Sequence, residues 1–478
     1  MLSVRTERLV AVYPSRTSLM AATLAAADVC GTGLAVVLGF WVWSLINPAI
    51  PPLQPVMALA PAFCIVMFAF ENLYPGLGMG AVEHIRRVFR GVTLVYLMLT
   101  AAMFMAKDRW ADSRGGFLLA WILSLALAPA ARWTASLVFG DRPWWGTPVM
   151  ILGAGESARR VIRNLAANRV LGYRAVVCLD DDPEKLGHCE GIPVAGALDD
   201  AADLALTCGT QYAIVAMPGM SRLQLTAHLR VWSSIFPNIL LIPDLFGVAS
   251  LWTEPRDLGG ILGLEIRHNL LRPLNRRIKR AVDICVAATI LLVISPLILL
   301  AALWIRAVSP GSPFFVQERE GENGNPVRIL KLRTMYLNAE EMLDRHLAAN
   351  PAARAEWDRF CKLKNDPRVL PGIGQLLRKT SMDEIPQLWN ILKGEMSLVG
   401  PRPFPAYHND RFDPEFRRLR TKVRPGLTGM WQVSARSDGD LDVQMSLDSY
   451  YINNWSLWLD LYILMRTVRV VLTGEGAY

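Results

Sequence analysis

The first 140 residues alternate long apolar stretches with short polar loops. Four stretches stand out, at about residues 19–46, 53–70, 91–106 and 117–139. Each approaches the ~20 residues that a bilayer-spanning helix needs. Arginines gather before the first stretch and after the second, whereas the loop at 47–54 carries no charge. Because positively charged loops stay in the cytoplasm, the pattern predicts a four-helix transmembrane bundle, residues 1–145, with both ends on the cytoplasmic side.

A fifth apolar stretch, about 281–305, differs because basic residues flank it on both sides. The flanking residues are Arg276, Arg277, Lys279 and Arg280 before it and Arg306 after it. Proline at 296 removes a backbone donor and clashes with the preceding turn. Since positive charge at both ends favours one face of the membrane, the sequence predicts a re-entrant helix that breaks at Ser295 and Pro296. A proline-kinked helix that crosses the membrane is the open alternative.

Between these apolar regions, residues 146–265 alternate short apolar runs with helical patterns. The runs lie at 148–152, 175–179, 212–216 and 239–242. Strands alternating with helices predict a parallel, doubly wound sheet, here an α/β Rossmann-like domain. Gly153 and Gly155 form a candidate nucleotide turn, because a GxGxxA pattern with acidic residues from Asp180 onward fits the dinucleotide fingerprint. The open alternative is that the domain has kept its tight glycine turn but serves assembly or regulation and does not bind a dinucleotide.

Composition and charge exclude several classes of protein. The 478 residues are 52% hydrophobic and 19% charged. Soluble globular proteins carry about 25% charged residues, which argues against a wholly soluble chain. The net charge is +4 over residues 1–147, −4 over 148–265 and +8 over 266–478, so the basic ends suit anionic lipid or phosphorylated substrates. Seven scattered cysteines without a CxxC pair argue against a disulfide framework or a zinc site.

Candidate chemistry is concentrated between residues 317 and 436. Residues 327–335 alternate like a strand, which carries Lys331 and Arg333. Ser381-x-x-Glu384 matches a capping box, which places Asp383 in the first turn of a helix, where a carboxylate or a phosphate is favoured. An ionised Asp383 can attack phosphorus, and Glu384 can hold a hard cation. By spacing alone, capping explains the two acids equally well.

Three blocks of this region resemble a known family. They are KLRTM at 331–335, NDPRVLPGIGQLLRKTSMDEIPQLWNILKGEMSLVGPRP at 365–403 and RPGLTGMWQVSAR at 424–436. The blocks are similar to the catalytic module of the bacterial sugar transferases, the monotopic phosphoglycosyl transferases. The resemblance covers about residues 270–478. The whole layout, with four helices and a Rossmann-like domain before this module, resembles the long-form polyprenyl-phosphate hexose-1-phosphate transferases.

The resemblance implies an α/β-mixed catalytic domain, residues 266–478, carried on the re-entrant helix. It implies an enzyme that moves hexose 1-phosphate, galactose before glucose, from a UDP-hexose to undecaprenyl phosphate. Asp383 attacks the sugar-bearing phosphate and releases UMP, undecaprenyl phosphate then attacks the aspartyl intermediate, and Glu384 helps to hold Mg²⁺. The residues that would bind the substrates are Lys331, Arg333, Arg378, Arg402, Arg424, Gln432 and Arg436.

The same resemblance extends to location and partners. It implies a multi-pass protein of the bacterial inner membrane, with the Rossmann-like and catalytic domains facing the cytoplasm. The expected product starts the synthesis of O-antigen, capsule or exopolysaccharide. A homodimer is expected, and a nucleic-acid partner is not.

Two other classes of function are weighed against this one. A non-catalytic membrane adaptor that senses nucleotide through Gly153, Gly155 and Ala158 predicts nucleotide affinity without turnover, and it leaves the acidic pair at 383–384 unexplained. A nicotinamide oxidoreductase predicts cofactor-dependent absorbance changes, but no hydride-transfer constellation follows the glycine turn.

Overall fold

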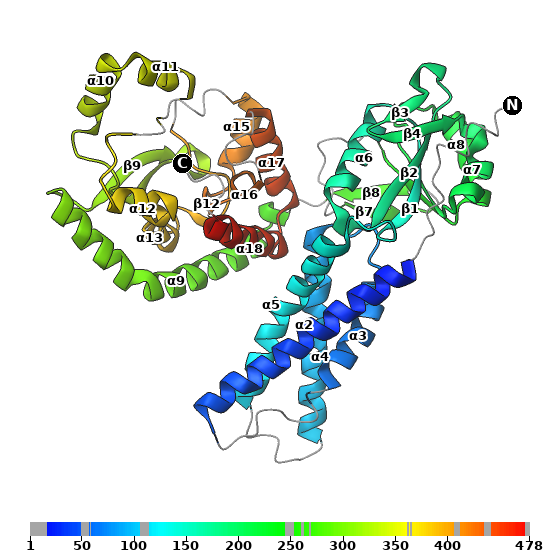
Figure 1. Ribbon diagram of the computed structural model, residues 1–478, viewed down its shortest axis with the longest axis horizontal. Helices are drawn as coiled ribbons and strands as arrows, with labels where there is room; N and C mark the ends of the chain where they lie inside the picture. Colours follow the sequence, from blue (N-terminus) through cyan, green and yellow to red (C-terminus); the bar gives the residue numbers. More distant parts are fainter. Residues whose placement is uncertain are drawn as a thin grey trace. The chain divides into compact units, whose positions relative to one another are not determined.

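The structure is a computed structural model of the full chain. Two compact units divide it, Met1–Leu245 and Phe246–Tyr478, and each is described by itself (Figure 1). The residues that the structure describes are 17–48, 57, 59–105, 114–243, 253–259, 262–266, 269–360, 363, 366–405, 412–434 and 441–473. The expected domain boundaries near residues 145 and 265 stay predictions.

The N-terminal apolar stretches form four helices, α2 (Thr17–Ile46), α3 (Ala60–Phe70), α4 (Ala81–Met105) and α5 (Arg114–Phe139). Helices α2, α4 and α5 are long and apolar enough to cross a membrane. Helix α4 begins ten residues before the predicted stretch at 91–106, which gives it a full span. Helix α3 has 11 residues, fewer than the ~20 of a span. The predicted stretch at 53–70 is therefore confirmed as helix only over its second part.

Helices α2 and α5 pack closely through small residues and a buried ion pair. A Cβ atom on Gly39 would lie 2.5 Å from the backbone nitrogen of Ala120, so only glycine permits this approach. Asp28 of α2 is fully buried and accepts hydrogen bonds from Arg132 of α5 at 2.6 and 2.7 Å. The hydroxyl of Tyr74 donates to the same carboxylate at 2.5 Å. Because a buried charge is stable only when paired, these contacts join α2 and α5 inside the apolar layer.

The predicted doubly wound sheet is confirmed. Its strand order is β3-β4-β2-β1-β5-β6, and β1 runs parallel to both β2 and β5. The one antiparallel pairing in this sheet joins β3 to β4. The strands are β1 (Thr147–Leu152), β2 (Tyr173–Leu179), β3 (Gly187–Cys189), β4 (Ile192–Gly196), β5 (Tyr212–Val215) and β6 (Asn238–Leu241).

Helices cover both faces of this sheet. Helix α6 (Glu156–Ala167) lies on one side, and α7 (Ala201–Cys208) and α8 (Arg222–Ile235) lie on the other (Figure 1). Alternate side chains of β1 therefore enter two separate cores, Val149 and Ile151 on the α6 side and Met150 and Leu152 on the other. Burial on both faces explains why β1 reads as a continuous apolar run.

The second unit is a mixed α/β module. It begins with the antiparallel hairpin β7 (Thr253–Asp257) and β8 (Leu262–Ile266) and the long helix α9 (Pro273–Val308). Strands β9 (Phe314–Glu320) and β10 (Pro326–Leu332) pair antiparallel, and β11 (Ser397–Val399) and β12 (Gly426–Thr428) pair parallel. The remaining helices are α10 (Ala339–Ala349), α11 (Pro351–Phe360), α12 (Ile373–Lys379), α13 (Gln387–Lys393), α15 (Pro414–Thr421), α16 (Met430–Ser434), α17 (Leu441–Asn454) and α18 (Leu457–Thr473).

Helix α9 bends but does not break into two helices (Figure 1). Because Pro296 has no N–H, the carbonyl of Leu292 loses its usual helical donor. The hydroxyl of Ser295 donates to that carbonyl at 2.9 Å and replaces the missing hydrogen bond. The predicted break is thus a bend within one continuous helix. Large apolar side chains such as Val293, which is 70% exposed, cover its surface, as membrane contact requires. Whether α9 is re-entrant or spans the membrane stays a prediction.

Candidate functional site

Asp383 and Glu384 lie in a single 3₁₀ turn, η8 (Met382–Glu384), just before helix α13. The predicted capping box is wrong. Ser381 has a left-handed backbone with φ of 56°, and its side chain makes no capping hydrogen bond. The Glu384 side chain bonds Lys331 and Arg402 instead of returning to the Ser381 backbone. Both carboxylates are therefore available for tertiary contacts or for a substrate.

Glu384 is held between two cations. Its Oε1 atom accepts a hydrogen bond from Nζ of Lys331 at 2.8 Å and from a terminal guanidinium nitrogen of Arg402 at 2.9 Å. Burial alone would raise the pKa of Glu384, but Arg402 and Lys331 lower it to about 2. Glu384 is therefore a fixed negative charge at neutral pH. It positions two cations that come from strand β10 and from the segment after β11.

Asp383 has a different environment from its neighbour. Its carboxylate has no ion-pair partner within the part of the chain that the structure describes. Burial and the negative charge of Glu384 raise its pKa above the ordinary value, while Lys331 and Arg378 oppose that shift. Two adjacent carboxylates whose pKa values are pushed apart are typical of a site with two chemical roles. Here the partnered acid is Glu384, and the acid that remains free to react is Asp383.

Some of the other predicted substrate-binding residues lie beside Asp383 and Glu384, and others make structural contacts away from them. Lys331 and Arg402 bond Glu384 directly. Arg378 of α12 donates through Nε to the hydroxyl of Thr334 at 3.2 Å and acts electrostatically on Asp383. Arg333, in contrast, is buried and donates to the backbone carbonyls at 309 and 310, just after α9. In the structure it therefore fixes the end of α9.

Three predicted residues come from the block at 424–436. Nε of Arg424 donates to Glu322 at 3.2 Å. Gln432 is buried in α16, where its amide nitrogen donates to a backbone carbonyl at 3.0 Å and its amide oxygen has no partner among the described residues. Arg436 lies outside the described residues. The substrate contacts expected of these three stay predictions.

A magnesium ion fits the free edge of the acidic pair. Both cations bond Oε1 of Glu384, so Oε2 has no partner in the described part of the chain. Mg²⁺ prefers oxygen ligands and is usually held by one or two carboxylates together with substrate phosphates. The described residues contain no group of three or more His, Cys, Asp or Glu side chains that could hold a metal ion. A Mg²⁺ ion shared between this pair and a diphosphate stays a prediction.

Two residues that the sequence did not single out fix the position of Arg402. Arg420 of α15 is buried and donates to the backbone carbonyl of Arg402. Its Nε lies 3.4 Å from the carboxylate of Asp448 on α17. Burial raises the pKa of Asp448 to about 6, although Arg420 opposes the shift. No local motif signals this arrangement, because the contacts join helices that are distant in sequence.

A second cluster that the sequence did not reveal ties α9 to the C-terminal helices. Asp460 of α18 accepts hydrogen bonds from Lys279 at 2.6 Å, from the Tyr451 hydroxyl at 2.8 Å and from the Trp455 indole at 3.1 Å. All four residues are buried, and Tyr451 is 1% exposed. Burying Lys279 is tolerable only because Asp460 compensates its charge. The membrane helix is thereby anchored to the rest of the catalytic unit.

We expect Asp460→Ala to destabilise this unit strongly. The substitution leaves the Lys279 ammonium buried without a counter-charge, which costs about 3–5 kcal/mol in comparable cases. Thermal unfolding of the full chain in detergent measures the effect, with Asp344→Ala, an exposed acid on α10, as the control. Equal melting temperatures for the two variants would show that the cluster does not stabilise the fold.

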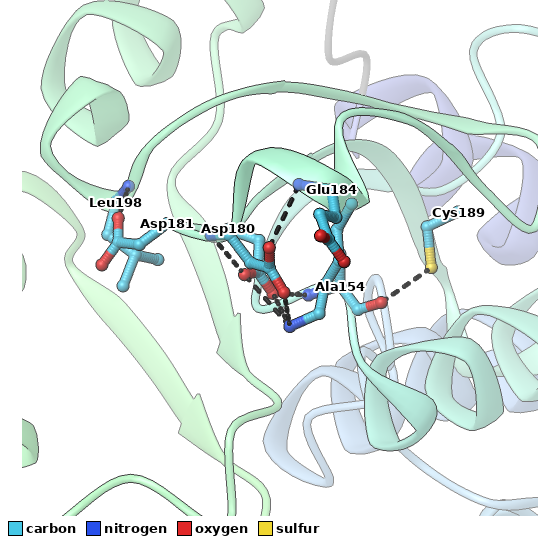
Figure 2. Close-up of polar contacts among 8 residues, drawn as sticks. Ala154, Asp180, Asp181, Glu184, Cys189 and Leu198 are labelled. Carbon is cyan, nitrogen blue, oxygen red and sulfur yellow. Dashed lines mark hydrogen bonds and ion pairs between the residues drawn. The ribbon is translucent and has the colours of Figure 1, made fainter.

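The glycine turn of the Rossmann-like sheet is closed by its own acidic residue (Figure 2). Asp180, at the end of β2, accepts a hydrogen bond from the backbone N–H of Ala154 at 2.7 Å and from that of Asp182 at 3.0 Å. Lys185 lies 3.3 Å from the same carboxylate. Burial would raise the pKa of Asp180, but these donors and Lys185 lower it, so an anion occupies the turn.

The rest of the acidic run is also used for local structure. Asp181 accepts a hydrogen bond from the backbone N–H of Leu198 at 2.8 Å, as Figure 2 shows. Asp182 accepts from the backbone N–H of Glu184 at 3.1 Å. A diphosphate placed at the turn would meet the Asp180 carboxylate, which bonds the Ala154 N–H, and the first-turn acid Glu156 of α6. The turn is therefore a poor fit for the diphosphate of a dinucleotide, which favours the structural interpretation of Gly153 and Gly155.

Two family models and several known proteins are similar to this chain. The model of the bacterial sugar transferase family matches residues 274–474, and a model described as a CoA-binding domain matches residues 75–243. The chain is 32% identical over 399 residues to the UDP-galactose-lipid carrier transferase of Erwinia amylovora, and 82% of each chain is covered. It is 33% identical over 400 residues to the undecaprenyl-phosphate galactose phosphotransferase of Salmonella typhimurium, again with 82% of each covered.

A shorter similarity involves a different sugar. Over 248 residues the chain is 36% identical to the UDP-glucose:undecaprenyl-phosphate glucose-1-phosphate transferase of Escherichia coli, and 50% of each chain is covered. The similarity to the galactose-named relatives thus extends over most of both chains. On this evidence the chain belongs to the bacterial sugar transferase family and resembles the undecaprenyl-phosphate galactose phosphotransferases over most of its length.

Proposed function

We propose that this protein transfers hexose 1-phosphate, galactose before glucose, from a UDP-hexose to undecaprenyl phosphate and so begins the assembly of a surface polysaccharide. The observation that carries the proposal is the asymmetry of the acidic pair. Glu384 is fixed by Lys331 and Arg402, whereas Asp383 has a raised pKa and no ion-pair partner among the described residues. The names of the relatives agree on a sugar phosphate donor and a lipid phosphate acceptor.

In the proposed first step, a carboxylate oxygen of Asp383 attacks the sugar-bearing phosphorus of the UDP-hexose. A bond forms between that oxygen and phosphorus, and the bond between phosphorus and the bridging oxygen breaks, so UMP leaves with the electron pair. Lys331, Arg378 and Arg402 surround the attacked phosphate with positive charge. Glu384 would hold Mg²⁺, which would neutralise further negative charge on the diphosphate.

In the proposed second step, a phosphate oxygen of the undecaprenyl phosphate attacks the same phosphorus. The acyl-phosphate bond to Asp383 breaks, which restores the carboxylate and yields undecaprenyl-diphosphate-hexose. A water-soluble donor and a lipid acceptor can meet only at the headgroup layer of the membrane. The bent, apolar helix α9 supports a site at that level, because its exposed side chains require a lipid environment.

UMP release across a panel of UDP-sugars tests reaction class and donor together. The full chain, in nanodiscs with undecaprenyl phosphate, is expected to release UMP fastest from UDP-galactose, then from UDP-glucose. Binding of the nucleotide sugar without any UMP release would instead favour a non-catalytic adaptor. The Asp180 contacts at the glycine turn speak against that alternative.

We further propose that both ends of α9 face the cytoplasm. Basic residues at 276–280 and Arg306 flank the apolar segment, and positive charge is retained on the cytoplasmic side. Single cysteines at Arg272 and Ala307, introduced into a cysteine-free chain, are expected to react with a membrane-impermeant maleimide only in inverted vesicles. Labelling of the two positions from opposite faces would show that α9 spans the bilayer.

The pH dependence of UMP release should report Asp383. Only its carboxylate form attacks phosphorus, and its pKa lies above the ordinary value because of burial and Glu384. The rate is therefore expected to fall as pH drops through that raised pKa. In Glu384→Gln the like charge is removed, so the acid limb of the pH–rate profile should move to lower pH. An acid limb at the same pH in both proteins would contradict this assignment.

A further inference from the structure

A cavity of about 460 Å³ lies along the N-terminal part of α9, within the catalytic unit. Its lining contains none of Asp383, Glu384, Lys331, Arg378 or Arg402, although it includes Arg424, which the sequence predicted as a substrate-binding residue. The cavity opens where the basic start of α9 passes into its apolar segment. Its walls combine apolar side chains with a dense set of cations.

The positive charge of this cavity is only partly compensated. Glu322 is shared by two arginines, with Arg276 at 2.6 Å and Arg424 at 3.2 Å. Lys279 is neutralised by Asp460, outside the lining. The remaining acid in the wall, Asp283, accepts its hydrogen bonds from Ser397 and the backbone of Leu398 and is bonded to no cation. Four arginines therefore face two carboxylates, which leaves two positive charges in excess.

Two of the arginines have no ion-pair partner among the described residues. Arg280 donates to the backbone carbonyls of Ile391 and Leu392 at the end of α13, and the carboxylate of Asp283 offsets its charge only from a distance. Arg280 lies close enough to Arg424 for the two charges to repel each other. Arg277 is exposed, lines the cavity and has no hydrogen-bond or ion-pair partner among the described residues. An anion in the cavity would remove this repulsion and pair with Arg277.

The apolar residues of the lining indicate which chemical group is attached to the anion. Apolar side chains form much of the surface between the cations, namely Leu270, Ala281, Ile284, Val399 and Val423. A free phosphate would leave this apolar surface exposed to water, whereas a phosphate attached to a hydrocarbon chain would cover it. Arg is well suited to phosphate, and the cavity lies on the helix that must be in contact with lipid.

We infer that this cavity is a binding site for the headgroup of an anionic membrane phospholipid, whose phosphate pairs with Arg277 and Arg280 and whose glycerol and upper acyl carbons cover the apolar wall. Because neither Asp383 nor the cations beside Glu384 line the cavity, this lipid is distinct from the acceptor substrate. It fixes the depth of α9 in the headgroup layer. The inference does not depend on the reaction proposed above.

The test is lipid binding to the delipidated full chain, followed by native mass spectrometry. The probes are dioleoyl-phosphatidylglycerol and dioleoyl-phosphatidylcholine, which share chains and differ in charge. Arg277→Glu removes the unpaired cation, and Ala281→Trp fills the cavity from an exposed position on the same helix. Arg306→Glu is the matched control, because it reverses an exposed charge at the other end of α9, outside the cavity.

We expect phosphatidylglycerol to bind more tightly than phosphatidylcholine. Arg277→Glu should weaken phosphatidylglycerol binding about tenfold, Ala281→Trp should weaken it as much, and Arg306→Glu should leave it within about twofold. UMP release in a fixed lipid mixture should remain measurable for all three, which separates this inference from the proposed function. Equal losses in Arg306→Glu and Arg277→Glu, displacement of the lipid by millimolar inorganic phosphate, or retention of undecaprenyl phosphate alone would overturn it.

Discussion

Replacing Asp383 with Asn is expected to reduce UMP release by at least about a thousandfold, because the amide cannot act as the nucleophile on phosphorus. The substitution keeps the shape of the side chain and removes its charge. Glu384 keeps its bonds to Lys331 and Arg402, so the surrounding cluster should stay in place. The measurement is the rate of UMP release from UDP-galactose by purified protein in nanodiscs.

The control for this prediction is Asp344→Asn, since Asp344 is an exposed acid of the same unit on helix α10. We expect that variant to retain full activity. The Asp383→Asn protein should elute and melt like the parent protein, because the raised pKa of Asp383 shows that its ionised form is not a source of stability. Full UMP release from a well-folded Asp383→Asn protein would rule out Asp383 as the nucleophile.

The second large effect is expected from Glu384→Gln, with UMP release reduced about a hundredfold and a weaker dependence on Mg²⁺. The amide cannot replace the fixed negative charge, and its loss leaves Lys331 and Arg402 facing each other without a counter-ion. Both cations then lose the charged partner that fixes their orientation toward the substrate phosphate. The measurement is the rate as a function of Mg²⁺ concentration at saturating UDP-galactose.

Glu341→Gln is the matched control, because Glu341 is a surface acid whose side chain is 73% exposed. It should show the parent rate and the parent Mg²⁺ dependence. An unchanged Mg²⁺ requirement in Glu384→Gln, at any rate of turnover, would show that Glu384 does not hold the ion. A loss of thermal stability without a change in Mg²⁺ dependence would assign it a purely structural role.

Periodicity predicted the parts of the fold that depend on local pattern. The apolar runs at 148–152, 175–179, 212–216 and 239–242 correspond to β1, β2, β5 and β6. Strand β1 is buried on both faces and therefore reads as a continuous apolar run, whereas β6 is largely exposed and was recognised from its apolar residues alone. The bend of α9 was predictable for a similar reason, because Pro296 removes one specific hydrogen bond.

The candidate site was predictable only as a set of residue types, and its geometry was not. The pair Asp383 and Glu384 stood out, but spacing indicated a capping box where the structure has a left-handed Ser381 and a 3₁₀ turn. A backbone conformation of that kind is imposed by tertiary contacts. These contacts include the bonds from Glu384 to Lys331 and Arg402, which lie 53 and 18 positions away in the chain.

The buried partners of the site were not predictable from any local motif. Arg420 and Asp448 meet from α15 and α17, and Asp460 collects donors from α9 and α17–α18. In the sequence each is one charge among many. At the glycine turn, in contrast, a local motif was present but misleading. It suggested a nucleotide site, whereas in the structure Asp180 accepts the hydrogen bond from the Ala154 N–H that a phosphate would use.

The most direct test is to incubate the full chain with UDP-galactose and no lipid acceptor, quench it in acid, and map the modified peptide by mass spectrometry. The account predicts a hexose phosphate on Asp383, with UMP formed in equal amount. It also predicts that adding undecaprenyl phosphate before the quench removes the adduct. An adduct on another side chain, or UMP release that requires the acceptor and leaves no adduct, would contradict it.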